Sequence, residues 1–153
     1  MTRTLSIDPG ASTGWALFDG SDLTFAGVLD PECAHPLALV PDVRSVSAIV
    51  TEYPEFRPGD TKSNPNDLIT LAMRAGVIEG MLRAHAPSAW WRRVRPSQWK
   101  GSVPKPIHNK RVLGALTARE MALLPNALKH DTIDAVGIGL WHVGRMGRGG
   151  RLA

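Results

Sequence analysis

The stretch TLSIDPG at residues 4–10 decides the fold, together with the stretch TGWALF at residues 13–18. Leu5 and Ile7 alternate with polar neighbours, which predicts a strand that is buried on one face. This strand ends at Asp8, because the Pro-Gly pair that follows cannot continue a ladder and favours a turn. The second stretch predicts a strand that returns beside the first one.

Asp8 therefore stands at the end of a rigid element, which is a suitable position for a metal-binding carboxylate. Asp-Pro-Gly is also a common turn sequence, in which the aspartate only bonds its own backbone. The N-terminal stretch alone leaves both interpretations open, and the rest of the chain has to decide between them.

The composition indicates an ordinary globular protein. A chain of 153 residues with 43% hydrophobic and 21% charged residues predicts a single domain with a real core. No apolar run approaches the roughly 18 residues of a membrane span, and the N-terminus lacks a signal-peptide pattern. Cys33 is the only cysteine, which excludes an intrachain disulfide and a thiolate zinc site. We expect a cytoplasmic protein with no membrane contact.

The remainder of the chain divides into further elements. Additional strands are predicted at residues 23–29, 45–51 and 89–94, and the second of these is a buried parallel strand that ends at Glu52. Helices are predicted at 67–85, at 109–123 and from 130 or 131 to 142, with a basic loop at 96–108. Prolines at 31, 36 and 41 exclude a stable helix across 30–43, apart from one possible turn near 37–40.

The domain boundary is expected near the C-terminal end. Residues 1–143 form the predicted domain, and residues 144–153 form a basic tail rich in Gly and Arg. We expect this tail to be disordered in isolation.

Asp131 and Asp134 are three residues apart on the last predicted helix, so their side chains share one face. In isolation such a pair would be an N-cap and a solvated acid. Here the helix is apolar nearly all round, and Gly137 and Gly139 each cost about 1 kcal/mol of helix propensity. A helix tolerates that cost when it must lie close to a sheet. Acids on so buried a helix need partners, and a cation is the simplest one.

The strand-end acids and the helix acids could converge on one site. Carboxylates gathered in a small space repel each other unless divalent cations lie among them. Hard oxygen ligands favour Mg²⁺ or Mn²⁺ over zinc. Two such ions about 4 Å apart would activate a water and stabilise the leaving oxygen in phosphodiester hydrolysis.

The distribution of charge favours a nucleic-acid partner. The net charge is +4, and no acidic residue lies between Glu79 and Glu120. Basic side chains in that interval predict a phosphate-binding track; they are Arg83, Arg92, Arg93, Arg95, Lys100, Lys105, Lys110, Arg111 and Arg119. Among the tryptophans, Trp99 in the basic loop is the candidate for stacking on bases, and most of the others are expected in the core.

Several motifs resemble those of one family. Ile7-Asp8-Pro9-Gly10 with Thr13-Gly14, the strand-ending Glu52 and His130-Asp131-x-x-Asp134-Ala135 are similar to the RuvC-type Holliday junction resolvases of the ribonuclease H-like superfamily, especially the short bacteriophage-style members. The segment 96–100 (PSQWK), with Lys105 further on, resembles the family's basic DNA-contacting segment. The resemblance covers nearly the whole chain in the same order.

The resemblance implies an α/β fold with a five-stranded mixed sheet flanked by helices, and it implies a homodimer. The family usually has a full helix between the third and fourth strands. In this chain that helix is expected to be shortened or missing, because the proline-rich segment 30–43 occupies its place.

The resemblance also implies an activity, namely Mg²⁺-dependent cleavage of branched DNA, with paired hydrolysis at four-way junctions. The implied catalytic residues and metal ligands are Asp8, Glu52, Asp131 and Asp134, which would hold two Mg²⁺ or Mn²⁺ ions. Tyr53 and Phe56 are the candidates for an aromatic side chain that stacks on junction bases. The implied DNA-contacting lysines are Lys100 and Lys105, and the other candidate nucleic-acid contacts are Arg92, Arg93, Arg95, Lys110 and Arg111.

His130 precedes the acid pair and is a candidate auxiliary residue, as a metal ligand or a general base. A histidine at the start of a helix also commonly caps the helix or meets solvent.

Other functions remain open at this stage. A phosphotransferase of the actin-like ATPase superfamily has a similar Asp-x-Gly-x-x-x-Gly loop, but it needs two related domains and a second phosphate loop. A nucleic-acid-binding module without catalysis is a further alternative, which the presence of all four acids disfavours. Within the nucleases, the sequence does not choose between junctions, flaps, single strands, RNA and RNA–DNA hybrids.

Overall fold

The computed structural model describes residues 1–10, 12–29, 35–56, 58–59 and 64–147. Its centre is a five-stranded sheet with the strand order β3-β2-β1-β4-β5. The first three strands form an antiparallel meander, and β4 and β5 run parallel to β1, which confirms the predicted mixed sheet. The strands are β1 (Arg3–Asp8), β2 (Thr13–Asp19), β3 (Asp22–Leu29), β4 (Ala48–Glu52) and β5 (Trp90–Val94).

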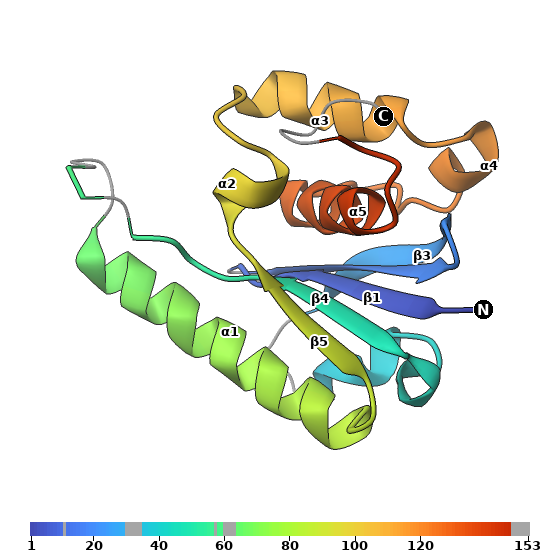
Figure 1. Ribbon diagram of the computed structural model, residues 1–153, viewed down its shortest axis with the longest axis horizontal. Helices are drawn as coiled ribbons and strands as arrows, with labels where there is room; N and C mark the ends of the chain where they lie inside the picture. The colour runs from blue at the N-terminus through green and yellow to red at the C-terminus, as the bar shows by residue number, and fades with distance from the viewer. Residues whose placement is uncertain (11, 30–34, 57, 60–63, 148–153) are drawn as a thin grey trace.

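Helices cover both faces of the sheet (Figure 1). The long helix α1 (Pro65–His85) lies on one face, together with the short 3₁₀ turns η1 (Pro36–Leu39) and η2 (Val43–Ser45). These single turns stand where a full helix would connect β3 to β4, so the predicted shortening is confirmed for the described part of that segment. The other face carries α2 (Pro96–Trp99), α3 (Lys105–Gly114), α4 (Ala118–Met121) and α5 (His130–His142).

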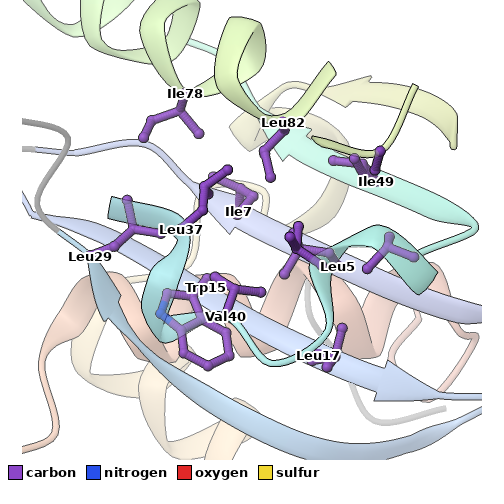
Figure 2. Packing of buried hydrophobic residues seen from close by; sticks show 13 residues of the cluster. Leu5, Ile7, Trp15, Leu17, Leu29, Leu37, Val40, Ile49, Ile78 and Leu82 are labelled. Carbon is purple, nitrogen blue, oxygen red and sulfur yellow. The ribbon is translucent and has the colours of Figure 1, made fainter. Parts of the chain in front are cut away.

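The core beneath α1 is built from alternate residues of the sheet. Figure 2 shows Ile78 and Leu82 of α1 pointing toward the sheet, where Ile7 and Ile49 are fully buried. Leu37 of η1 completes the same cluster. No helix within the described ranges is long and apolar enough to cross a membrane.

The last helix, α5, packs on the opposite face, and residues 132–140 are all buried. A Cβ atom added to Gly139 would lie 2.0 Å from the ring of Phe18, and one added to Gly137 would lie 2.7 Å from the ring of Trp99. The hydroxyl of Ser6 donates a hydrogen bond of 2.7 Å to the carbonyl of Ala135. The glycines therefore allow the close approach that the sequence predicts.

The region between β5 and α5 differs from the prediction. The single helix expected at 109–123 is wrong, because the chain forms two helices, and the first one already begins at Lys105 inside the expected basic loop. The expected helix is interrupted at Thr117. The Thr117 hydroxyl accepts a hydrogen bond from the N–H of Glu120, and the Glu120 carboxylate accepts one from the N–H of Thr117. This reciprocal capping starts α4 as a separate helix.

The segment after α5 begins by packing against the domain. Arg145 donates to Oε2 of Glu120 over 2.8 Å, and it also donates to the carbonyl of Ser21 over 3.1 Å. The side chain of Met146 is buried. Residues 148–153 of the predicted tail lie outside the described residues.

Candidate active site

The parallel pairing of β1 with β4 places two acids side by side. Ile7 pairs with Thr51, so the residues that follow them, Asp8 and Glu52, end neighbouring strands at the same edge of the sheet. Asp8 lies two residues after Ser6, whose hydroxyl bonds α5, so both side chains are directed to the α5 face. The side chain of Asp8 is buried, with 8% relative exposure.

The first turns of α5 bring the second pair of acids to the same place. Ser12, in the turn after β1, donates a hydrogen bond of 2.8 Å to Oδ2 of Asp131. The backbone at Gly14 lies so close to Asp131 that a Cβ there would be 1.8 Å from its carbonyl oxygen. Asp134 is buried one turn later. The close approach of β2 to the start of α5 therefore fixes where Asp131 stands relative to Asp8.

Lys100 lies among these acids. Its ammonium is 3.3 Å from Oδ2 of Asp134 and 3.9 Å from Oε2 of Glu52. Burial alone would lower the pKa of Lys100, but the carboxylates of Glu52 and Asp134 raise it overall. Lys100 therefore carries a positive charge and partly neutralises the cluster.

The negative charge of the cluster exceeds what one lysine neutralises. Burial raises the pKa of Asp8 well above its usual value, and the charges of Glu52 and Asp134 raise it further. Burial also raises the pKa of Glu52, although Lys100 and the indole of Trp99 oppose this effect. Carboxylates that resist ionisation in this way gain stability when a cation binds them.

The donor chemistry fits a hard divalent cation. The acids supply only carboxylate oxygens, which suits Mg²⁺ or Mn²⁺, and Oδ1 of Asp134 is buried without a hydrogen-bond partner in the described structure. Among the described residues, however, no three His, Cys, Asp or Glu side chains stand close enough together to hold an ion as they are. The ammonium of Lys100 contacts both Glu52 and Asp134, so an ion bound there would compete with it for the same oxygens.

The sequence interpretation missed two side chains behind the acids. Trp99 is fully buried, and its indole N–H donates a hydrogen bond of 2.6 Å to Oε2 of Glu52. His108 packs edge-on against Trp99, with ring centroids 4.9 Å apart, and its Nε2 lies 3.6 Å from Oδ1 of Asp134. Trp99 as a base-stacking side chain is therefore wrong, because the ring lies over Gly137 in the core.

The sequence contains a pattern that indicates that Trp99 and His108 are buried. His108 and Val112 are one helical turn apart, so both face α5 once the helix is known to begin at Lys105. Gly137 on the facing helix marks the place that the ring of Trp99 fills. The expected loop at 96–108 hid this pattern.

His130 takes a different position from the acids. It is exposed at the start of α5, and its Nδ1 lies 2.9 Å from Nδ2 of Asn109. This contact joins α5 to α3.

The candidate stacking residues lie beyond the end of β4. The hydroxyl of Tyr53 accepts a hydrogen bond of 2.6 Å from Nε of Arg95, whose guanidinium lies 6.0 Å from the ring centroid. Phe56 is 68% exposed. Trp90 is an exception to the expectation that most tryptophans lie in the core: it is 55% exposed and stacks on His142, because β5 is an edge strand.

Some of the basic side chains between residues 80 and 119 have partners within the protein, and others are exposed. Arg93 pairs with Glu79 across β5 and α1, and Arg92 lies 4.5 Å from the ring centroid of Trp141. Lys105 and Lys110 are exposed on α3, and Arg111 is half-buried there.

The fold has relatives among solved structures, although no family model and no curated protein matches the chain. A structure of Thermus thermophilus RuvC in complex with a Holliday junction substrate has 16% identity and a TM-score of 0.58 over 92% of each chain. Another Thermus thermophilus RuvC structure has 18% identity and a TM-score of 0.55, covering 92% of this chain and 93% of the other. The fowlpox virus Holliday junction resolvase has 14% identity and a TM-score of 0.58, covering 93% and 98%.

These structures match the chain almost from end to end, and the match with the fowlpox virus resolvase also covers nearly all of that protein's chain. Together with the strand order and the flanking helices, they establish the architecture. The chain has the ribonuclease H-like fold of the RuvC-type resolvases.

Proposed function

We propose that the protein is a metal-dependent, structure-selective DNA endonuclease that resolves four-way junctions by paired phosphodiester hydrolysis. The observation that carries the proposal is that the buried Asp8 interacts electrostatically with Glu52, Asp131 and Asp134, and that Lys100 contacts Glu52 and Asp134. The relatives support the choice of substrate, since one is a RuvC in complex with a Holliday junction and another is named a Holliday junction resolvase.

The proposed ligands of two Mg²⁺ or Mn²⁺ ions are these four carboxylates. When bound, such ions activate a water and stabilise the leaving oxygen of the scissile phosphate. The carboxylates of Asp8 and Asp134 are buried on rigid elements, so they hold their positions without reorganisation. Lys100 would then be available to a phosphate oxygen, and the exposed Lys105 at the start of α3 is a second candidate for such a contact.

The surrounding surface provides candidate DNA contacts. Tyr53 and Phe56 follow the strand-end Glu52 and are proposed to meet bases at the branch point. Basic side chains would bind phosphates on either side; these are Arg92, Arg93, Arg95, Lys110 and Arg111. His130 remains a candidate auxiliary group, which would have to leave Asn109 to reach the acids.

Helix α1 supports the proposal of a homodimer. Ile69, Met73 and Val77 repeat every four residues along its outer face, and they are 59%, 68% and 51% exposed. A Cβ added to Gly76 or Gly80 would have nothing within 4 Å, so the backbone is open to close approach beside this stripe. An apolar stripe of this kind is typical of an interface. Two protomers would place two active sites on one junction.

The test is cleavage of labelled four-way junctions, flaps, RNA–DNA hybrids and linear duplex, with Mg²⁺, Mn²⁺ or chelator. We expect paired symmetric nicks in junctions that disappear with chelator and in Asp8→Asn. The matched control is Asp67→Asn, an exposed acid in the first turn of α1, which should cut like the wild type.

The other outcomes separate the alternatives. Metal-dependent cutting of other branched DNA or of hybrids would retain the active site and overturn the junction specificity. Tight junction binding without cleavage under any metal would favour a non-catalytic binding module.

A further inference from the structure

We propose that Trp99 and His108 are positioning residues of the candidate metal site, which hold Glu52 and Asp134 in the orientation that binds the ions. This inference rests on the proposed function, because it concerns the same carboxylates. The two side chains belong to the basic region of α2 and α3, but they are buried, so their proposed role is separate from DNA contact.

The contact of Trp99 with Glu52 is the first argument. The indole has a single donor, and it is used on Oε2 of Glu52 at 2.6 Å, although the ring is completely buried. A short hydrogen bond to a carboxylate fixes the rotamer of that side chain. Glu52 is the last residue of its strand, so its own element constrains the side chain least. The indole therefore sets the direction of the second carboxylate oxygen.

The contact of His108 with Asp134 is the second argument. Both ring nitrogens of His108 and Oδ1 of Asp134 are buried without a hydrogen-bond partner in the described part of the chain. Buried polar atoms without partners are rare in native proteins, and such exceptions are often functional. Nε2 of His108 and Oδ1 of Asp134 are only 3.6 Å apart, so a movement of a few tenths of an ångström makes a hydrogen bond. Lys100 contacts the other oxygen of Asp134.

The two rings form one unit. They meet edge to face at an interplanar angle of 69°, with Trp99 coming from α2 and His108 from α3. The unit lies behind acids that belong to two other elements, the end of β4 and the second turn of α5. The two rings therefore tie the positions of Glu52 and Asp134 to the positions of α2 and α3. Apolar rings of the same size would fill this space equally well, so packing alone does not explain the polar atoms.

The size of the effect follows from other metal sites, where removing a group that orients a ligand typically reduces metal affinity or activity about 10- to 100-fold. The full chain is therefore compared as wild type, Trp99→Phe, His108→Phe and His108→Gln. Phe keeps the aromatic packing and removes the donor, whereas Gln can bring a side-chain N–H to the place of Nε2. Mg²⁺ binding is measured by calorimetry without DNA, and the Mg²⁺ dependence of kcat and KM is measured on junctions.

The matched control is Val112→Ala. Val112 is fully buried and lies beside Gly137 in the same layer, so its truncation creates a cavity there. Its side chain has no polar atom that could orient a carboxylate. Circular dichroism is used to check that each variant is folded.

We expect Trp99→Phe and His108→Phe to weaken Mg²⁺ binding about 10- to 100-fold and to lower kcat, with KM for the junction nearly unchanged. His108→Gln and Val112→Ala should stay within a few-fold of the wild type. Full Mg²⁺ affinity in His108→Phe together with weaker Mg²⁺ binding in His108→Gln would overturn the proposal. That result would mean that the ring of His108 matters for packing and that its nitrogen atoms do not matter. Equal losses in Val112→Ala and Trp99→Phe would overturn it as well.

The calorimetry also separates this inference from the proposed function. Normal Mg²⁺ binding by a wild type that cleaves no nucleic acid, with the expected losses in the Phe variants, would support the positioning role and overturn the nuclease. Absence of Mg²⁺ binding by the wild type would overturn both.

Discussion

At the scale of single residues, the acids of the candidate site oppose folding. Asp8 is nearly buried beside Glu52 and Asp134, and one ammonium cannot offset all of their charge. Sites that gather like charges trade stability for function. By contrast, Glu120 is a buried acid that stabilises the fold, because Arg145 and backbone N–H groups surround it.

Replacing Asp8 with Asn should therefore stabilise the metal-free protein. Asn is nearly isosteric and removes a buried negative charge, so we expect the free energy of unfolding in chelator to rise by about 1 kcal/mol. Urea unfolding followed by circular dichroism measures this change. Saturating Mg²⁺ should abolish or reverse the difference, since only the wild type gains its full binding energy. A less stable Asp8→Asn in chelator would contradict the expectation.

Glu120 should make stability fall in acid. Burial raises the pKa of Glu120, but the hydrogen bonds from Arg145, Thr117 and Leu23 lower it to about 2, below the usual 4.5. Its contribution is therefore complete above pH 4.5 and is lost as the pH falls toward 2. At neutral pH, Glu120→Gln should lose about 2 to 3 kcal/mol of unfolding free energy. Urea titrations between pH 7 and pH 3 should show this gap narrowing. A constant gap would indicate that charge is not the cause.

At the scale of elements, α5 determines the site, because it carries Asp131 and Asp134 and covers the sheet. The sequence predicts this helix well, since an apolar run with glycines admits few other arrangements. The α2–α4 region was predicted poorly, because a reciprocal capping pair at Thr117 and Glu120 splits one amphipathic pattern into two helices. Side-chain contacts such as that of Trp99 with Glu52 depend on this geometry, so sequence spacing alone could not find them.

The fit of α5 can be tested at Gly139. A methyl group there would overlap the ring of Phe18, so we expect Gly139→Ala to lose about 1 to 3 kcal/mol of unfolding free energy despite the better helix propensity of Ala. Thermal and urea unfolding measure the loss. The control is Gly114→Ala at the end of α3, where a Cβ has nothing within 4 Å. The control should be neutral or slightly stabilising. Equal effects at both positions would mean that α5 is not packed as described.

At the scale of the whole molecule, the proposed active site and the apolar stripe of α1 lie on different faces of the sheet (Figure 1). The first would act on one strand of DNA, and the second would bring two copies together. The residue patterns predicted the individual strands and excluded a full helix across the proline-rich segment between β3 and β4, and the family resemblance implied the mixed sheet. Dimerisation followed only from the family resemblance, because the stripe at Ile69, Met73 and Val77 cannot be distinguished from a core-facing pattern until α1 is placed.

Met73→Asp should therefore separate the protomers. A charge in the middle of the stripe would have to be desolvated on association, so we expect a monomer in light scattering coupled to size exclusion. Junction cleavage should change from paired nicks to single, independent nicks. The control is Arg74→Asp at the next residue of α1, which is half-buried and lies outside the stripe, and this change should leave the mass unchanged. A dimer that survives Met73→Asp would place the interface elsewhere.

The position of α5 along the chain also has a consequence during synthesis. All five strands leave the ribosome before α5, so the growing chain exposes Ala16 and Phe18 on the sheet face that α5 later covers. Asp131 and Asp134 arrive with the element that closes the core. The nascent protein can therefore acquire neither its final packing nor its complete set of acids early, and its proposed ability to cut DNA would begin only when translation of α5 is complete.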